Sequence, residues 1–430
     1  MLFSSSLRNS KRSAQRAGFR SPLESLEIRR LFSSAIVQTN LVSDDTQVTP
    51  AQVQDANLVN PWGLAASPTG EWWVANEGTG TSTLYDTSHP QATVDPLVVD
   101  IPASTDANPF PLPHSPTGIV FHDPTAGGFD LTPGNDSTSS KFVFATLDGT
   151  ISGWNRALPD LNNAVVMAQS PSALYTGLAI GTGSQGQMLY AADFANGKID
   201  VYDQNFQAVA NAVGNFTDSE LPDGYHPFNI QAINNQFYVE YAPVSKILAG
   251  KANQGDGAVD VYSADGKLQQ RLIRHGHLDQ PWAIALAPAN FGSFSNDLLV
   301  GNFGDGHINA FDPKNGHFDG ELRDANGQPI AITHLWGLAF GNGGQAGPTN
   351  TLYFTAGLTS HLAPSDNPFH GLFGSLQVAT HRERDSASIV SSPKMPTSTM
   401  SSLNGVFAQQ IDTIFQERNR GVLGVVDFIF

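Results

Sequence analysis

The chain has 430 residues and is rich in Gly (41), Pro (27) and Phe (26), while only 14% of its residues are charged. This turn-rich, aromatic composition excludes a coiled coil or a helical bundle, and the sequence has no run of about 20 apolar residues that could span a membrane. The formal net charge of −17 opposes binding to a phosphate backbone, so nucleic acid is not expected as a partner.

Residues 1–34 form a basic leader, which we expect to be disordered. Seven Lys and Arg side chains stand against two Glu, so the segment carries a net charge of +5. It lacks the apolar core of a secretory signal peptide, but Glu24–Ser34 resembles the short Leu-Glu-x-Arg-x-Leu-Leu-Ser motif that begins many exported proteins of one bacterial lineage. That resemblance implies export to the cell surface or the extracellular space. A leader without any address is the alternative.

Residues 35–380 contain six copies of one repeat. Each copy begins with a polar residue, often followed by proline, and an apolar run of the type Asn60-Pro-Trp-Gly-Leu-Ala. The fourth residues of the six runs stand at positions 63, 118, 177, 229, 283 and 337, which are 52 to 59 residues apart. A period of about 40 to 60 residues indicates a propeller or a solenoid.

Two further strands follow the first apolar run in every copy. The second strand is a short apolar segment such as Trp72-Trp-Val-Ala, and the third usually ends on an aromatic residue such as Tyr85. Between them lies a frame in which Asn or Asp is followed four residues later by Gly, as in Asn76 with Gly80. Asn and Asp satisfy turn amides and Gly accepts a positive φ, so the frame predicts a hairpin.

Outer strands complete the repeating unit. The runs Leu97–Asp100, Val165–Ala168 and Leu268–Ile273 are interpreted as fourth strands, which makes each copy a four-stranded antiparallel blade. Six such blades packed radially form a closed β-propeller. The sixth copy has no fourth strand of its own, whereas Ala35–Val42 is unassigned. The sequence therefore predicts an all-β, six-bladed β-propeller over residues 35–380, whose last blade is closed by an N-terminal strand, and an unassigned C-terminal tail over 381–430.

Four segments of these repeats resemble the signature segments of an uncharacterised bacterial family of six-bladed propellers. They are Tyr190–Asp203, Leu221–Gln231, Leu299–Pro313 and His370–Leu376. Members of that family are exported conserved hypothetical proteins, some with exosortase-type sorting tails, and are distantly similar to NHL propellers. The resemblance implies the fold and export but no established activity. Blade five departs from the pattern with Pro-Trp-Ala in place of Pro-Trp-Gly, and the tail does not resemble a sorting tail.

Two rings of side chains are expected to meet at one mouth of the central channel. The loop into the innermost strand and the loop between the second and third strands open on the same face, and insertions at 243–252 and 358–366 lengthen loops there. The candidate ligand-binding residues are Asn60, Asn76, His114, His226, Gln280, Asn302 and His334. Such groups suit one divalent ion such as Ca, Zn or Mn, with Asp193, Glu240, His226 and His334 as candidate ligands. Alternatively, each polar side chain only satisfies backbone groups of its own loop.

Three functions stay open from the sequence. We expect an exported, monomeric and non-enzymatic propeller that binds a small molecule or a protein partner at its loop-rich mouth. The first alternative is a metal-dependent hydrolase of the lactonase type, in which Asp193, Glu240, Asn302 and the histidines hold one ion. The second is a structural component of an extracellular matrix. The inner-strand aromatics Trp62, Phe228, Trp282 and Trp336 are expected to pack in the core.

Overall fold

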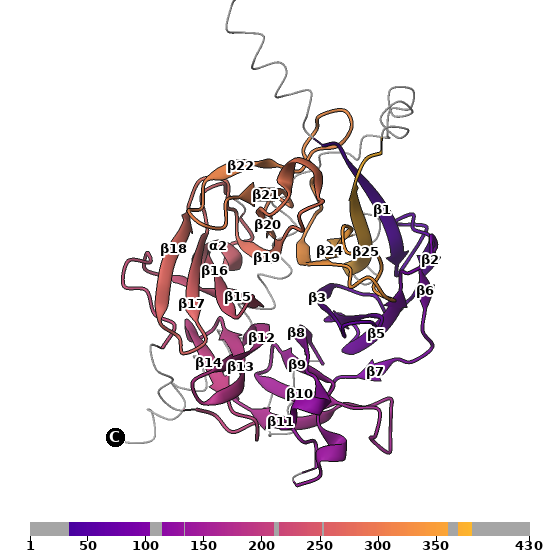
Figure 1. Cartoon of the computed structure of the whole chain (residues 1–430), viewed down its shortest axis with the longest axis vertical. Helices are drawn as coiled ribbons and strands as arrows, with labels where there is room; N and C mark the ends of the chain where they lie inside the picture. The colour runs from indigo at the N-terminus through magenta and orange to yellow at the C-terminus, as the bar shows by residue number, and fades with distance from the viewer. Residues whose placement is uncertain are drawn as a thin grey trace, which may run out of the picture. The chain divides into compact units, whose positions relative to one another are not determined.

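The computed structural model describes residues 34–103, 114–132, 134–209, 215–251, 253–359 and 369–380. The leader before Ser34, the tail from position 381 and most of the blade-six insertion lie outside these residues. The described strands form six sheets that are arranged radially around a central axis (Figure 1). The predicted all-β, six-bladed propeller is confirmed.

The first three blades follow one another from the N-terminal side. Blade one contains β3 (Pro61–Ala66), β4 (Trp72–Asn76), β5 (Thr81–Asp86), β6 (Thr93–Val94) and β7 (Val99–Asp100). Blade two contains β8 (Pro116–Phe121), β9 (Phe142–Thr146), β10 (Thr150–Trp154) and β11 (Val165–Gln169). Blade three contains β12 (Tyr175–Gly183), β13 (Gly186–Asp193) and β14 (Lys198–Tyr202).

The other three blades complete the ring. Blade four contains β15 (Tyr225–Ile233), β16 (Gln236–Pro243), β17 (Ala258–Ser263) and β18 (Leu268–Arg274). Blade five contains β19 (Pro281–Leu286), β20 (Leu298–Asn302), β21 (Ile308–Phe311) and β22 (Phe318–Glu321). Blade six contains β23 (Leu335–Phe340), β24 (Leu352–Thr359), β25 (Phe369–Val378), β1 (Ile36–Ser43) and β2 (Val53–Gln54). Short helical turns are η1 (Pro124–Ala126), η2 (Asp136–Thr138), α2 (Val244–Leu248) and η3 (Gly292–Phe294).

The predicted fourth strands are found in blades one, two and four as β7, β11 and β18. Blade three differs, because its sheet has three strands and its fourth position is held by a single bridge between Tyr202 and Ala208. The Val209 amide donates to the carbonyl of Val201 at 2.8 Å, which fixes this short return of the chain. Within the described residues, this short return is what pairs with the outer side of β14.

The ring is closed by the N-terminal strand, as the sequence predicts. β1 pairs antiparallel with β25, from Ile36 opposite Val378 to Ser43 opposite Leu372. Val42 is fully buried in the cluster that contains Trp72, Tyr353 and Phe373. Because strands from both ends of the propeller share one sheet, blade six has no unpaired edge at this position.

The hairpin frame behaves as predicted only where the connection is short. Gly80, Gly149, Gly197 and Gly306 have φ of 72°, 81°, 66° and 74°, which glycine adopts without strain. Blades four and six have longer connections between the second and third strands. Their frame glycines, Gly257 and Gly371, stand next to or within the third strand and do not have positive φ. In blade four the reversal is spread over a longer loop, in which Gly250 and Gly255 have φ of 58° and 98°. Most of the blade-six connection lies outside the described residues.

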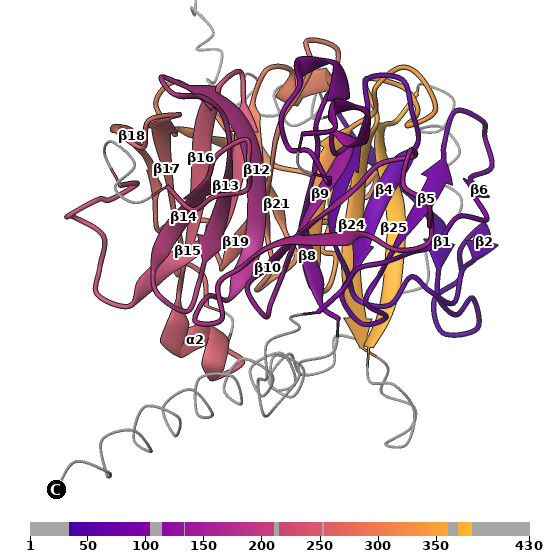
Figure 2. The same ribbon diagram turned by 90° about the horizontal axis from the view of Figure 1, so that it is seen from below.

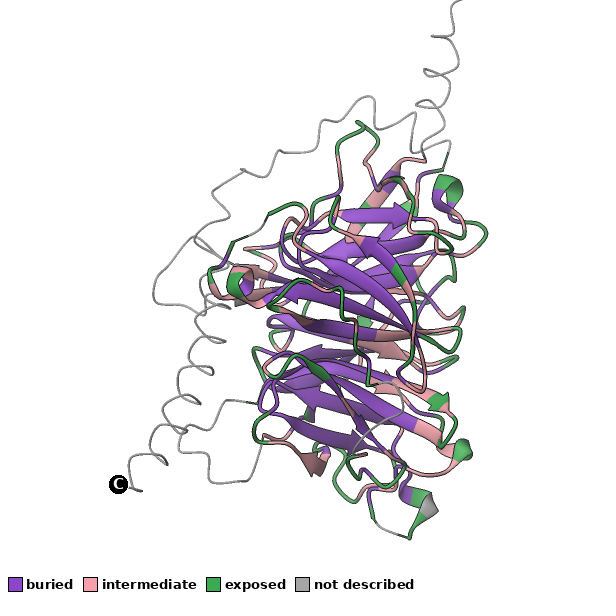
Figure 3. Ribbon diagram, turned by 90° about the vertical axis from the view of Figure 1, so that its left-hand side faces the viewer, coloured by how far each residue is buried: buried purple, intermediate pink, exposed green. Residues whose placement is uncertain are grey.

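The core lies between neighbouring blades (Figure 3). Alternate side chains of a strand point to opposite faces of its sheet, so each blade buries both faces against its neighbours. Between blades one and two, Trp73 stacks on Phe142 with ring centroids 4.3 Å apart and lies 4.6 Å from Trp154. Between blades six and one, Trp72 lies 5.1 Å from Tyr353. Within the described residues, no helix is both long and apolar enough to cross a membrane.

Candidate functional site

The two predicted rings of side chains do gather at one face of the propeller. The register places Pro61 opposite Asn76 in blade one and Tyr175 opposite Asp193 in blade three. Each innermost strand therefore begins where the second strand ends. This face, here called the mouth, also carries α2, which Figure 2 shows projecting beyond the strands.

Aromatic side chains fill the channel at the mouth. The rings of Trp62 and Trp336 stack with centroids 3.5 Å apart, and Trp282 packs edge-on against both at 6.1 and 5.6 Å. Phe303 and Phe228 lie 4.3 and 6.0 Å from Trp336. All five side chains are at most 4% exposed. The inner-strand aromatics are core residues, as predicted, and together with Phe303 they form an aromatic plug.

Sequence reasoning missed a further ring of residues at the mouth, each one position after the second-strand residue that pairs with the second residue of the innermost run. Its members are Glu77, Leu147, Phe194, Ala242, Phe303 and Gly357. Four of the six belong to the same buried cluster as the plug. Part of the signal was present in the sequence, because Glu77, Phe194 and Phe303 stand directly after Asn76, Asp193 and Asn302 of the hairpin frame. Glu77 is the acid of this ring.

Asn60 and Glu77 are engaged with the plug. The Asn60 side chain donates from Nδ2 to Oε2 of Glu77 at 2.7 Å and accepts from Nε1 of Trp336 at 3.1 Å. Burial raises the pKa of Glu77, while hydrogen bonds from Asn60 and Ser115 lower it. The network links blades six, one and two. These two residues thus stabilise the closed mouth.

The three predicted histidines bind separate backbone carbonyls. Nδ1 of His114, His226 and His334 lies 2.7, 2.6 and 2.9 Å from the carbonyls of Ile101, Phe194 and Gly357 respectively. Because a carbonyl only accepts, Nδ1 carries the proton in each ring. The His334 ring also stacks on Phe303 at 5.1 Å. His114 and His226 therefore tie the start of their blades to the preceding blade, and His334 ties two segments of blade six together.

The other three predicted amides also use their donors within the scaffold. Nε2 of Gln280 donates to the Lys251 carbonyl at 2.5 Å, and Nδ2 of Asn302 donates to the His277 carbonyl at 2.9 Å. Nδ2 of Asn76 donates to the hydroxyls of Thr81 and Thr83. Within the described residues, the amide oxygens of Asn76, Gln280 and Asn302 have no hydrogen-bond partner.

The four candidate metal ligands do not form one set. Asp193 accepts from the Leu174 amide at 3.0 Å and from Nδ2 of Asn196 at 2.6 Å, so it completes its own turn. Glu240 stands inside β16, and His226 and His334 bind carbonyls. Among the residues that the structure describes, no three His, Asp or Glu side chains are arranged to hold a metal ion.

Glu240 is the most unusual of the candidates. Its side chain is fully buried, and neither carboxyl oxygen has a hydrogen-bond partner within the described residues. Burial raises its pKa well above the ordinary value. It lies directly opposite Asn229 of β15, so both side chains project from the same face of the sheet.

Replacing Glu240 by glutamine is expected to change how stability depends on pH. The folded-state pKa is raised, so the folded protein retains this proton to higher pH than the unfolded chain does. Stability from this group is therefore greatest at low pH and falls as pH rises above about 4.5. Glutamine does not ionise, so the Glu240→Gln variant does not lose stability in this way as pH rises. Its free energy of unfolding should be about 2 kcal/mol higher than that of the native chain at pH 8 and nearly the same at pH 4. Urea unfolding across this range measures it.

The control for this experiment is Asp223→Asn, which removes an exposed carboxylate. Its unfolding free energy should follow the native pH profile. A Glu240→Gln profile parallel to the native one would show that Glu240 is ionised in the folded protein.

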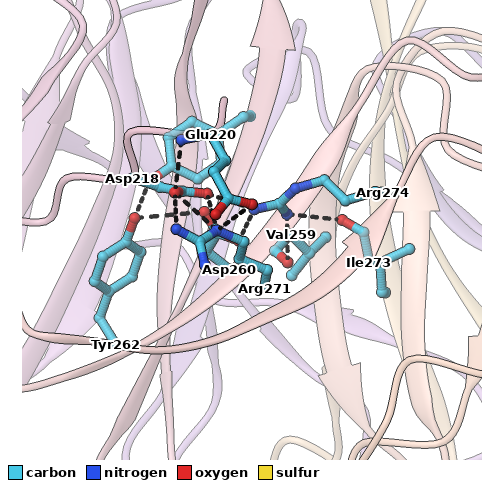
Figure 4. Close-up of polar contacts among 9 residues, drawn as sticks. Asp218, Glu220, Val259, Asp260, Tyr262, Arg271, Ile273 and Arg274 are labelled. Atoms are coloured by element: carbon cyan, nitrogen blue, oxygen red, sulfur yellow. Dashed lines mark hydrogen bonds and ion pairs between the residues drawn. The ribbon is translucent and has the colours of Figure 1, made fainter. Parts of the chain in front are cut away.

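A second group of charges, in which the carboxylates are buried and the arginines reach solvent, lies at the rim of blade four (Figure 4). Asp218, in the loop before β15, contacts Arg271 and Arg274 at 2.7 Å each, and Arg274 also pairs with Asp260. Burial opposes ionisation of Asp218, but the two arginines prevail and lower its pKa. Burial raises the pKa of Asp260 to about 6 against the attraction of Arg274. Tyr262 donates to Asp260 at 3.4 Å. The charges are mutually paired and fasten the loop to the blade.

The channel contains a cavity of about 310 Å³, here called the lumen. Blade one lines it with Gly63–Ala66 and Trp72, blade two with Gly118–Phe121, blade three with Leu178–Ile180, blade four with Asn229–Ala232, blade five with Trp282, and blade six with Gly337–Phe340 and Asn342. The early residues of β3, β8 and β23 are buried and their last residues are partly exposed. The lumen therefore opens on the face opposite the mouth, and Trp282 of the plug lies at its closed end.

These features define a closed six-bladed β-propeller with a plugged mouth and a lumen at the other end of its axis. The chain is 32% identical over 343 residues to uncharacterized protein R648 of Acanthamoeba polyphaga mimivirus, and the match covers 78% of each chain. The chain belongs to the family that includes R648. Uncharacterized protein L690 of the same virus is 32% identical over 292 residues, which cover 66% of this chain and 74% of that one. No family model matches the chain.

The predicted membership of a bacterial family of exported propellers is wrong, because these relatives are viral and no bacterial family is supported. Segments such as Tyr190–Asp203 consist of two strands and their hairpin. Their sequence is therefore typical of a propeller blade and does not indicate which family the protein belongs to.

Among solved structures, virginiamycin B lyase from Staphylococcus aureus aligns with a TM-score of 0.43 and 14% identity, over 80% of this chain and 99% of that one. A likeness at this level transfers no activity.

Proposed function

We propose that this protein is a non-enzymatic binding propeller that takes a small, uncharged molecule in its lumen. The observation that carries the proposal is the lumen itself, a cavity of about 310 Å³ on the axis whose lining contains no charged side chain. That volume is at the lower end of the range of about 300 to 1,000 Å³ that small-molecule pockets span. A charged ligand would lose its hydration there without gaining a partner.

The lumen supports this proposal better than the mouth does. At the mouth, Trp62, Trp282 and Trp336 fill the axis, and the predicted polar residues bind neighbouring loops. In the lumen, innermost strands from all six blades surround one space, and most of the lining residues are apolar. Apolar pockets with a few polar groups are the usual sites for small ligands.

Titration with the neutral dye N-phenyl-1-naphthylamine tests the proposal. We expect a rise in dye fluorescence that saturates at micromolar concentration, because the dye leaves water for an apolar site. Ala339→Trp should abolish the saturable rise, since an indole at this lumen-lining position fills the cavity. The matched control is Ala325→Trp in an exposed turn, which should bind the dye like the native chain. Native-like circular dichroism of both variants shows that they fold.

Two results would contradict the proposal. One is a native chain that gives no saturable rise in fluorescence. The other is an Ala339→Trp variant that is folded and binds the dye as tightly as the native chain, because the dye would then occupy some other surface.

A further inference from the structure

Blade four breaks the repeat at three positions that surround the lumen or adjoin it. At the fourth residue of the innermost run, five blades have Gly or Ala and blade four has Asn229. At the sixth residue, the other five have Ala or Val and blade four has Gln231. At the fourth residue of the second strand, the others have Ala75, Ala145, Ala192, Gly301 and Thr355, whereas blade four has Glu240.

The small residues of the other blades have a packing reason. A Cβ atom on Gly177 would lie 2.0 Å from Oδ1 of Asn229, and one on Gly337 would lie 2.2 Å from Cδ2 of Leu64. Small residues therefore let neighbouring innermost strands approach around the axis. The other five blades keep Gly or Ala at the first of these positions and Ala or Val at the second, so amide side chains at these two positions are confined to blade four. Such exceptions to a repeat are expected at functional positions.

Asn229 and Gln231 place amides in the wall of the lumen. They stand two residues apart on β15, so their side chains leave the same face of the sheet, and both residues line the lumen. Nδ2 of Asn229 donates to the Trp282 carbonyl at 2.6 Å, which fixes its orientation. Gln231 is partly exposed and makes no side-chain hydrogen bond within the described residues.

Among the other lining residues that the structure describes, no side chain combines an unused donor with an unused acceptor as the Gln231 amide does, and the Trp72 indole Nε1 is an unpartnered donor only. Leu64, Ile119 and Leu178 contribute apolar side chains from blades one to three. The remaining polar lining residue, Asn342 of blade six, donates to the carbonyls of Ser67 and Gly70 and accepts from the amides of Gly344 and Ala346. Its hydrogen-bonding groups are already used. Within the described lining, the side-chain amide whose donor and acceptor are both unused is therefore that of Gln231, on the blade-four side.

We infer that the lumen selects an apolar, ring-sized molecule that carries one uncharged carboxamide-like group, and that this group binds to Gln231 beside Asn229 on blade four. This inference rests on the proposed function and names its ligand class. A carboxamide offers one donor face and one acceptor, which match the acceptor and donor of a glutamine amide. An apolar ligand of the same shape would cover the Gln231 amide without replacing its hydrogen bonds to water, which costs binding free energy.

Two compounds of nearly the same shape test this inference. 2-Naphthamide carries the carboxamide and 2-ethylnaphthalene lacks it, and displacement of N-phenyl-1-naphthylamine measures the affinity of each. For the native chain we expect 2-naphthamide to bind at least tenfold more tightly. For Gln231→Ala we expect the two compounds to bind within about twofold of each other. The variant introduces the alanine that blades one, three, five and six have at this position, namely Ala65, Ala179, Ala285 and Ala339, so the fold is preserved.

The matched control is Gln236→Ala, which removes another glutamine of blade four. Its Nε2 donates to Gln269 at 3.0 Å on the exposed surface, so the variant should keep the tenfold preference. A native chain that binds both compounds equally, or a Gln231→Ala variant that keeps the preference, would overturn the inference while leaving the binding function intact. Failure of both compounds to displace the dye, or of the dye to bind, would overturn the binding function as well.

Discussion

Replacing Trp336 by alanine is expected to lower the free energy of unfolding by about 3 to 5 kcal/mol, the usual cost of deleting a large buried aromatic side chain. Trp336 is 1% exposed and lies at the centre of the plug, stacked on Trp62 and packed against Trp282 and Phe303. The substitution also removes its hydrogen bond to Asn60. Urea unfolding followed by tryptophan fluorescence and circular dichroism measures the loss.

The control for the plug is Leu161→Ala, because Leu161 is a large hydrophobic residue with 37% exposure. Its unfolding free energy should stay within about 0.5 kcal/mol of the native value. A loss below about 1 kcal/mol for Trp336→Ala would mean that the aromatic side chains at the mouth are not tightly packed in solution.

Introducing a charge into the closing strand should open the ring. Val42 of β1 is fully buried among Trp72, Tyr353 and Phe373, where an aspartate would find no partner. Val42→Asp is therefore expected to cost about 4 kcal/mol or more, since an unpaired charge loses its hydration. Thermal melting measures the loss of stability. Hydrogen exchange should show lost amide protection first in β1 and β25, which pair with each other.

Gln38→Asp provides the comparison on the same strand. The Gln38 side chain is exposed, so its replacement adds a charge to β1 in contact with water and should leave melting and exchange unchanged. If Val42→Asp melted at the native temperature, β1 would contribute little to holding blades six and one together.

The architecture was predictable because its signals are local and repeated. Apolar runs about one strand long, hairpin glycines such as Gly80 and the unassigned segment 35–42 each constrain only their own stretch of chain, and the period then places them in one ring. The same local reasoning gave a wrong answer for the family of the protein. Segments that encode a blade were taken for the mark of a bacterial family, whereas the relatives are viral.

The candidate site was less predictable, since it depends on contacts between blades. The sequence indicated residues at the ends of the inner strands, and the register places Pro61 opposite Asn76 and Tyr175 opposite Asp193. It did not indicate that Glu77 would accept from Asn60, or that the three histidines would each bind a carbonyl. Such hydrogen bonds to backbone groups depend on the conformation of neighbouring loops, and the spacing of residues in the sequence does not predict that conformation.

The sequence by itself determined the all-β class, the six blades, the closing strand and the blade-four exceptions Asn229, Gln231 and Glu240, because each is a matter of period and residue type. Only the tertiary structure decided which end of the channel is open. That outcome depends on Trp62, Trp282 and Trp336 meeting across the axis from three blades. The hydrogen bond from Trp336 to Asn60 spans 276 positions of sequence, and packing over such separations is set by the closed ring as a whole.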